Sequence, residues 1–319
     1  MQRPASFTRA DSYTDTDIRP DATADPGTPR VPDSRDATGT GGVPDTRAAS
    51  DAAPPPPRRT GKASRAARIP RVLAGVPHAA MALVLAPVLL VQGRRTVRRT
   101  PRLDPASGAD RGTVAGAVPL LRLVVIGEST AAGVGAAEHE RALPGFLAGA
   151  LQRRLRRGVA WVVSGKNGAT ARRIGTDLVP ALDADQDGAP PDIVVVTVGI
   201  NDLMRRRPLK TWTADLTDLL GALRGRYRDA EVIVAGMPPV HRFPALPQPL
   251  RLVMGGRARA MDRIMREVAR ANGAVHVPMD PDMAADRTLF ASDGFHPSPD
   301  GYRAWANDLA EAVGTERAA

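Results

Sequence analysis

Residues 120–130 read LLRLVVIGEST, an apolar run that is interrupted once by arginine and followed by a glycine turn. A strand with one face in water alternates apolar and polar residues, so this nearly continuous run predicts a strand buried on both faces. Strands of that kind occur where helices cover both faces of a parallel sheet. The turn after the run carries Ser129, the first residue of chemical interest.

Four more apolar runs follow along the chain, and helix-like stretches separate them. The runs are 159–163, 193–198, 232–235 and 274–277, and the helix-like stretches are 141–156, 171–182, 211–227, 251–272 and 299–313. This alternation predicts a three-layer α/β/α fold over residues 118–315, with a flavodoxin-like, doubly wound, mostly parallel five-stranded sheet. In the strand order 2-1-3-4-5, functional residues gather at the carboxyl edge of the sheet.

Residues 1–66 have a different composition, which is rich in Pro, Asp and Thr and contains ten of the 30 prolines. Its isolated apolar residues cannot bury enough surface to offset the entropy lost on ordering. We therefore predict a disordered N-terminal tail over residues 1–66. A basic-flanked apolar segment and a linker follow over residues 67–111.

Residues 72–92 carry no charged side chain, and a helix of 21 residues spans about one hydrocarbon core of a bilayer. Three interpretations are open: a single membrane anchor, a basic helix at the membrane surface, or an apolar helix docked on the folded domain. We predict the first, and hence a membrane-associated, single-pass protein; a cytoplasmic protein is the alternative. The arginines that flank the segment would contact the membrane surface, and they are Arg71, Arg94, Arg95, Arg98 and Arg99. The side of the membrane that holds the folded domain stays open.

The net charge of +10 is concentrated outside the predicted domain. Residues 58–111 hold 12 basic and two acidic residues, whereas residues 118–319 hold 26 basic and 23 acidic residues. With only 3% aromatic residues, the chain also offers few rings for base stacking, so we predict no nucleic-acid partner. The absence of cysteine excludes disulfides, thiolate zinc sites and a cysteine nucleophile. The histidines show no metal-ligand spacing, so we predict no metal site.

Three predicted strands end in turns with residues that can carry chemistry. Ser129 follows the first strand, and either presents its hydroxyl at the edge of the sheet or caps the next helix. Gly168 lies in an Asn-Gly turn after the second strand, and either serves that turn alone or points its backbone N–H into a site. Asn201 follows the third strand, and either caps a turn or donates its side-chain N–H to a developing oxyanion.

Near the C-terminus, His296 follows Asp293 by three positions in a loop bounded by glycine and proline. At this spacing the carboxylate can bond one ring nitrogen of the histidine. The other ring nitrogen is then free to take a proton from a serine.

These four blocks, in the order Ser, Gly, Asn and Asp-x-x-His, resemble the SGNH hydrolases, also called GDSL-type esterases and lipases. The resemblance covers residues 120–313, and the chain departs from the family pattern at Glu128, where the family usually has aspartate. It implies the SGNH hydrolase fold, with Ser129 as nucleophile, His296 as general base and acid, and Asp293 orienting His296. It also implies an oxyanion hole formed by the N–H groups of Ser129 and Gly168 and the side chain of Asn201. No cofactor or metal takes part in this mechanism.

The sequence therefore predicts a serine ester hydrolase that acts on a carboxylic ester through an acyl-enzyme intermediate. The substrate would be a small-molecule, lipid or glycan ester. An acyltransferase or a glycan deacetylase using the same site is the alternative, as is a catalytically silent, membrane-tethered scaffold. Val240, Phe243 and Leu246 either contact an acyl chain or belong to a stiff connector, and the arginines at 205–207 either attract an anionic substrate or face solvent.

Overall fold

The computed structural model describes residues 85–182 and 189–314, all of which lie in one compact unit, Arg68–Ala319. The predicted disordered tail, residues 1–66, lies outside the described residues, and so does most of the apolar segment at 72–92.

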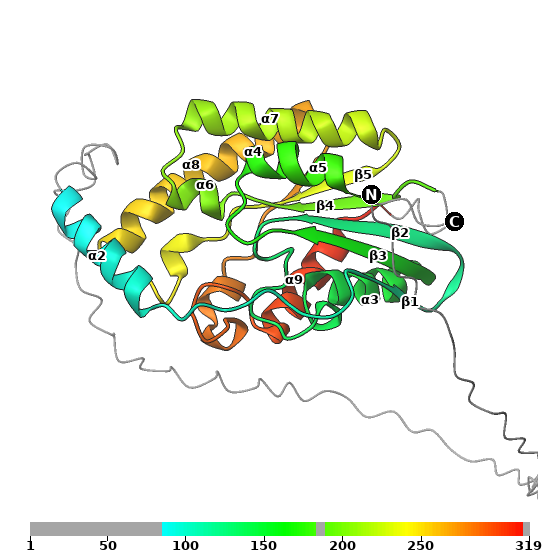
Figure 1. The fold of residues 1–319 in the computed structure, drawn as a ribbon, viewed down its shortest axis with the longest axis horizontal. Coiled ribbons are helices and arrows are strands. Elements are labelled where there is room, and N and C mark those ends of the chain that lie inside the picture. Colours follow the sequence, from blue (N-terminus) through cyan, green and yellow to red (C-terminus); the bar gives the residue numbers. More distant parts are fainter. Residues whose placement is uncertain (1–84, 183–188, 315–319) are drawn as a thin grey trace, which may run out of the picture. The chain divides into compact units, whose positions relative to one another are not determined.

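Within the described residues, the sheet has six strands in the order β1-β3-β2-β4-β5-β6 (Figure 1). They are β1 (Arg111–Val114), β2 (Ala117–Gly127), β3 (Arg157–Gly165), β4 (Ile193–Thr197), β5 (Glu231–Ala235) and β6 (Val275–Val277). Strands β2 to β6 are parallel and match the five predicted strands in the predicted order 2-1-3-4-5. The three-layer, doubly wound fold is therefore confirmed.

The predicted strand number of five is wrong by one, because β1 adds an antiparallel strand to the outer edge of β3. β1 is only four residues long, and its residues alternate between exposed and half-buried. A short edge strand of this kind has no continuous apolar run, so the apolar pattern does not reveal it. β1 also begins before residue 118, where the domain was predicted to start.

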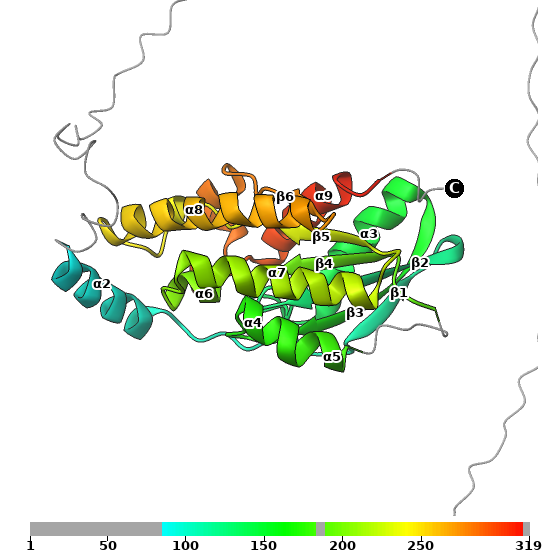
Figure 2. The ribbon, with the colours of Figure 1, turned by 90° about the horizontal axis from the view of Figure 1, so that it is seen from above.

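Helices cover both faces of the sheet (Figures 1 and 2). One face is covered by α3 (Leu143–Leu155) and α9 (Pro299–Glu311), and the other by α4 (Ala171–Arg173), the π-helical turn η3 (Ile174–Leu178), α5 (Val179–Ala181), α7 (Leu209–Arg226) and α8 (Leu250–Ala271). Successive residues of β2 point to opposite faces, so Leu123 and Val125 join one core while Val124 and Ile126 join the other. All four side chains are fully buried, as the continuous apolar run predicts.

Short elements lie in the connections. They are α6 (Ile200–Met204) and the 3-10 turns η2 (His139–Arg141), η4 (Val240–Arg242), η5 (Met283–Ala285) and η6 (Arg287–Leu289). Helix α9 begins where Ser298 accepts a hydrogen bond from the Gly301 N–H and Pro299 occupies the first turn. This start fixes the end of the loop that carries Asp293 and His296.

The prediction of a single-pass membrane protein is wrong. Among the described residues, no helix is both long enough and apolar enough to cross a bilayer. The end of the apolar segment forms α2 (Ala86–Arg99), which has 14 residues and bears arginines in its second half. The described residues also give no support to the predicted contact of the flanking arginines with a membrane surface.

Helix α2 instead packs beside the start of α8 (Figures 1 and 2). Leu89 is 5% exposed and joins the core cluster on that face of the sheet. The Gln92 side chain accepts a hydrogen bond from the Leu250 N–H (3.1 Å) and donates one to the Gln248 carbonyl (2.6 Å). The described part of the segment therefore docks on the folded domain, which was the third interpretation.

Candidate active site

Ser129 lies in the turn that leaves β2 at the carboxyl edge of the sheet. Strands β2 and β4 approach so closely here that a Cβ on Gly127 would lie 2.1 Å from the Thr197 carbonyl oxygen, so only glycine fits. No helix begins at Ser129: the chain turns through residues 129–135, and the Val134 N–H donates to the Ser129 carbonyl at 3.0 Å. Ser129 is therefore not a helix cap, and its hydroxyl faces His296 instead.

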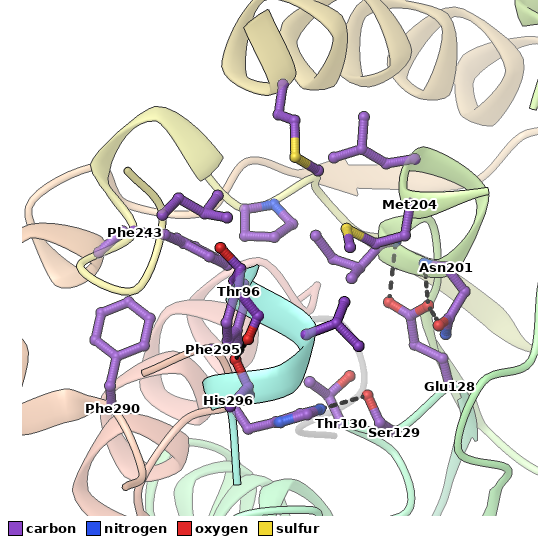
Figure 3. A pocket seen from close by; sticks show the side chains of 18 of the residues that line it. Thr96, Glu128, Ser129, Thr130, Asn201, Met204, Phe243, Phe290, Phe295 and His296 are labelled. Carbon is purple, nitrogen blue, oxygen red and sulfur yellow. Dashed lines mark hydrogen bonds between the residues drawn. The ribbon is translucent and has the colours of Figure 1, made fainter. Parts of the chain in front are cut away.

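Ser129, His296 and Asp293 form a continuous chain of hydrogen bonds. Figure 3 shows its first bond, between Ser129 and His296. The Nε2 atom of His296 lies 2.9 Å from the Oγ of Ser129, and its Nδ1 lies 2.5 Å from an Asp293 carboxylate oxygen. The other Asp293 oxygen accepts the backbone N–H groups of Phe295 (2.9 Å) and His296 (3.0 Å). The structure thus brings together the three residues predicted to be catalytic.

The environment of Asp293 favours its ionised form. Burial of its side chain acts to raise the pKa, but hydrogen bonds from the His296 ring and from the N–H groups of Phe295 and His296 outweigh it. The net effect is a pKa below the usual range of an aspartate. A carboxylate that stays charged beside His296 can stabilise the imidazolium form of that ring.

Two backbone N–H groups of the predicted oxyanion hole lack an acceptor. Among the residues that the structure describes, neither the Ser129 N–H nor the Gly168 N–H donates a hydrogen bond. Gly168 has a φ of +80°, which favours glycine, and a Cβ built there would meet open space. The Asn-Gly pair does form the expected turn, and Asn167 lines the cavity beside Ser129. Both N–H groups are thus available to a ligand.

The Asn201 side chain is not available in the same way. It lies in the first turn of α6, and its amide nitrogen donates to Glu128 Oε2 (2.8 Å) and to the Ala169 carbonyl (3.0 Å). These two bonds occupy both amide hydrogens. The structure therefore places Asn201 close to Ser129, as predicted, but with its predicted donor already engaged.

Glu128 is the functional residue that the sequence analysis missed as a site residue. It is 4% exposed, and its carboxylate accepts the N–H groups of Ile200 and Asn201, both at 3.2 Å, besides the Asn201 amide. Burial raises the pKa of Glu128 to about 7, although these hydrogen bonds oppose the shift. The one sequence signal was its longer side chain at the position where the family usually has aspartate.

A second buried carboxylate, Asp202, connects two of the turns at the site. Asp202 is fully buried, and its Oδ2 accepts the Ala171 N–H at 3.0 Å, which joins α6 to the start of α4. Its burial raises its pKa. Glu128 and Asp202 thus tie the segments that carry Ser129, Gly168 and Asn201 to one another.

A large cavity adjoins the hydrogen-bonded chain and has a volume of about 1030 Å³. One part of its wall is aromatic: Phe243 packs edge-to-face on Phe290 (centroids 5.4 Å apart) and on Phe295 (6.1 Å). Phe243 and Leu246 line the cavity, whereas Val240 is buried in the core and does not. Helix α2 forms another part of the wall, to which Leu89 and Thr96 contribute. Figure 3 shows Thr96 in this wall.

The described residues contain no group of three or more His, Asp or Glu side chains arranged to hold a metal ion. The expectations of no metal and no cofactor stay predictions.

The chain is similar to known proteins of one family. A family model described as the GDSL-like lipase/acylhydrolase family matches residues 125–304, which is more than half of the chain. The chain is also 31% identical over 199 residues to a GDSL-like esterase of Mycobacterium tuberculosis, over 59% of this chain and 60% of that relative. The chain thus spans about three fifths of the length of the curated relative that it matches.

Similar solved structures include the lipase Lip_vut3 from a goat rumen metagenome and an extracellular lipase from Streptomyces rimosus. The first is 17% identical with a TM-score of 0.49, over 62% of this chain and 100% of that one. The second is 18% identical with a TM-score of 0.48, over 60% of this chain and 100% of that one. The match of the family model confirms the resemblance drawn from the four sequence blocks: the chain belongs to the GDSL-like lipase/acylhydrolase family.

Proposed function

We propose that this chain is a serine ester hydrolase that works through an acyl-enzyme intermediate. The observation that carries the proposal is the continuous hydrogen-bonded chain from Ser129 through His296 to Asp293 beside an apolar cavity. We assign the activity to the predicted domain at 118–315 together with β1, which completes its sheet.

The geometry supports the following sequence of steps. As the Ser129 hydroxyl oxygen attacks the ester carbonyl carbon, His296 Nε2 takes the hydroxyl proton, and Asp293 stabilises the imidazolium that results. The tetrahedral intermediate then collapses, and His296 gives its proton to the departing alcohol oxygen. A water molecule, deprotonated by His296, attacks the acyl-enzyme, and the carboxylic acid leaves as Ser129 regains its proton.

The free N–H groups of Ser129 and Gly168 are the proposed donors to the oxyanion of the tetrahedral intermediate. We assign the third donor to Asn201. Its amide would give up the hydrogen bond to the Ala169 carbonyl and donate to the oxyanion instead, while it keeps its bond to Glu128. A developing full charge is a stronger acceptor than a neutral carbonyl, so the exchange favours the transition state over the ground state. Loss of one such donor commonly removes about 3–4 kcal/mol of transition-state stabilisation.

The proposal is tested by labelling the full chain with a fluorophosphonate probe and measuring hydrolysis of short p-nitrophenyl esters. Ser129→Ala should abolish labelling and lower kcat by about 10⁴-fold or more. Ser292→Ala is the matched control, because Ser292 is exposed in the loop before Asp293. The probe should label this variant as it labels the wild type. Equal labelling of the Ser129→Ala variant would overturn the proposal, and a folded wild-type chain inert toward probe and esters would favour the silent scaffold.

A further inference from the structure

The cavity has two chemically different sides. Figure 3 shows Phe243 and Phe290 on one side, and Asn201 and Met204 on the other. Two residues after Met204 comes Arg206, which lines the same cavity, as does Arg257 of α8. The lining of the cavity therefore combines an aromatic group with two guanidinium groups.

These two arginines differ from their neighbour Arg207 in how their charge is compensated. Arg207 pairs with the buried carboxylate of Asp215 at 2.5 Å. Among the described residues, by contrast, no carboxylate lies within ion-pair distance of Arg206 or Arg257. Two positive charges thus stand uncompensated in the wall of the cavity.

Arg257 is only partly satisfied by hydrogen bonds. Its Nη2 donates to the Arg207 carbonyl, while its buried Nε has no acceptor in the part of the chain that the structure describes. Burial, and then the charge of Arg206, lower the pKa of Arg257, so the two guanidinium groups repel each other. An unpaired buried donor and an unfavourable like-charge pair are both relieved by a bound anion.

The backbone of Arg206 also lies in an unfavourable conformation. Its φ is +53°, in the left-handed region that glycine, asparagine and aspartate adopt more readily than arginine. This conformation closes the end of helix α6, where the Arg206 N–H donates to the Leu203 carbonyl (3.0 Å) and the Arg207 N–H donates to the Asp202 carbonyl (2.9 Å).

Most of the other ionisable side chains in the lining are basic. The described lining contains one acidic side chain, Glu128, which is buried and hydrogen-bonded to Asn201. It contains three further arginines from α2 and the segment that follows, namely Arg94, Arg98 and Arg102. A negatively charged ligand is therefore favoured in this cavity over a neutral or a positive one.

We propose that Arg206 and Arg257 bind an anionic oxygen group of the ester substrate, a carboxylate or a phosphate, while an apolar chain lies against the phenylalanines. The inference rests on the proposed function and narrows its substrate class to anionic, amphiphilic esters. Arginine suits this role because its planar fork of donors matches two oxygens of a carboxylate or phosphate at once.

A binding measurement tests the inference without relying on turnover. Isothermal titration of the full chain compares hexyl phosphate, hexanoate and the neutral hexanol. Hexyl phosphate and hexanoate should bind at least tenfold more tightly than hexanol. Either Arg206→Gln or Arg257→Gln should weaken the binding of both anions about tenfold. Arg263→Gln is the matched control, an exposed arginine on the same helix as Arg257 that does not line the cavity. The inference would be overturned if the anions bind no more tightly than hexanol, or if neither substitution changes the affinity for the anions.

A kinetic measurement separates this inference from the proposed function. The hexanoate ester of 4-hydroxybutanoate and the monohexanoate ester of butane-1,4-diol have a carboxylate or a hydroxymethyl group at the far end of the alcohol part. Monohexyl succinate and hexyl butanoate have a carboxylate or a methyl group at the far end of the acyl part. The inference is supported if the anionic ester of either pair has the higher kcat/KM. Arg257→Gln should then reduce the kcat/KM for that anionic ester about tenfold, and Arg257→Lys should reduce it less. Hydrolysis of all four esters with no variant-dependent preference would sink the inference and leave the hydrolase intact. Failure to hydrolyse any ester, with anion binding intact, would sink the hydrolase alone.

Discussion

Two neighbouring carboxylic acids at this site have opposite pKa shifts, because different forces dominate around them. Asp293 accepts two backbone N–H groups and the His296 ring, and these bonds outweigh its burial and lower its pKa. Glu128 is buried more deeply, and three hydrogen bonds do not offset the loss of solvation that raises its pKa to about 7. The first acid is thus suited to stay charged beside an imidazolium, whereas burial favours the neutral form of the second.

Asp293→Asn should separate the charge of this residue from its place in the fold. Asparagine can still accept the N–H groups of Phe295 and His296, so the loop should keep its shape, but it carries no charge to stabilise the imidazolium. We expect kcat for a short ester to fall by about 10⁴-fold. Asp300→Asn, at an exposed acid in the first turn of α9, should leave kcat unchanged. A loss of less than tenfold in the Asp293 variant would show that its charge is not needed.

Glu128→Gln should change how stability depends on pH. The usual pKa is 4.5 and the folded value is about 7, so between these values the folded chain binds more protons than the unfolded chain. Stability from this group is complete below pH 4.5 and is lost as the pH rises through about 7, by up to about 3 kcal/mol. The difference in unfolding free energy between wild type and Glu128→Gln, from urea titrations, should fall by about that amount between pH 4.5 and 7.5. The exposed Glu267→Gln should show no such trend, and parallel curves for wild type and Glu128→Gln would contradict the prediction.

At the scale of elements, helix α2 shows where the sequence stops being informative. The inner parallel strands were predictable because burial on both faces leaves a nearly continuous apolar run in each, as at residues 120–126. The sequence of an apolar segment does not show what the segment is buried against, because a bilayer and a protein core are both apolar environments. The contacts of Gln92 with Gln248 and Leu250 join residues more than 150 positions apart, and no local pattern encodes them.

The docking of α2 predicts a difference between two aliphatic residues on one helix. Leu89 is 5% exposed, whereas Val91 is 59% exposed. Leu89→Ala should lower the free energy of unfolding by about 2–4 kcal/mol, because a cavity replaces buried atoms. Val91→Ala should change it by less than about 0.5 kcal/mol. Equal effects of the two substitutions in urea titrations would mean that α2 does not pack on the domain.

The candidate site was also predictable only in part. The spacing of Asp293 and His296 and the exits of three strands indicated which residues meet, because parallel strands end at one edge of the sheet. The bond from Glu128 to Asn201 was not predictable, because it depends on the length of one side chain across a gap of 73 residues. The strand order, which places β2 beside β4, brings these residues together, but it does not say which atoms of Asn201 remain free.

At the scale of the whole molecule, the cavity is assembled from segments that are distant in the sequence. Its lining comes from α2, from the turns after β2 and β4, from the connection between β5 and α8, and from the loops before α9. A binding surface of this kind depends on the complete fold, and no single motif determines its shape. Its selectivity is therefore a property of the packed domain.

Phe243→Ala should change selectivity for the acyl chain. Phe243 contacts both other phenylalanines of the aromatic wall, so its removal takes away the surface against which an apolar chain would lie. We expect the ratio of kcat/KM for an octanoate ester to that for an acetate ester to fall about tenfold. The matched control is Phe146→Ala, at a ring that packs on the opposite face of the sheet and does not line the cavity. A ratio that changes equally in both variants, or in neither, would argue against an acyl-binding role for Phe243.

The two carboxylates that tie the turns together also set a condition for redesign. Glu128 joins the serine turn to α6, and Asp202 joins α6 to the segment that follows Gly168. A turn transplanted from a relative with aspartate at position 128 would bring a side chain one methylene shorter, which falls short of the Asn201 amide. The three turns therefore form one exchangeable module. Chimeras that replace all three turns together should stay active, whereas chimeras that replace only one turn should lose activity.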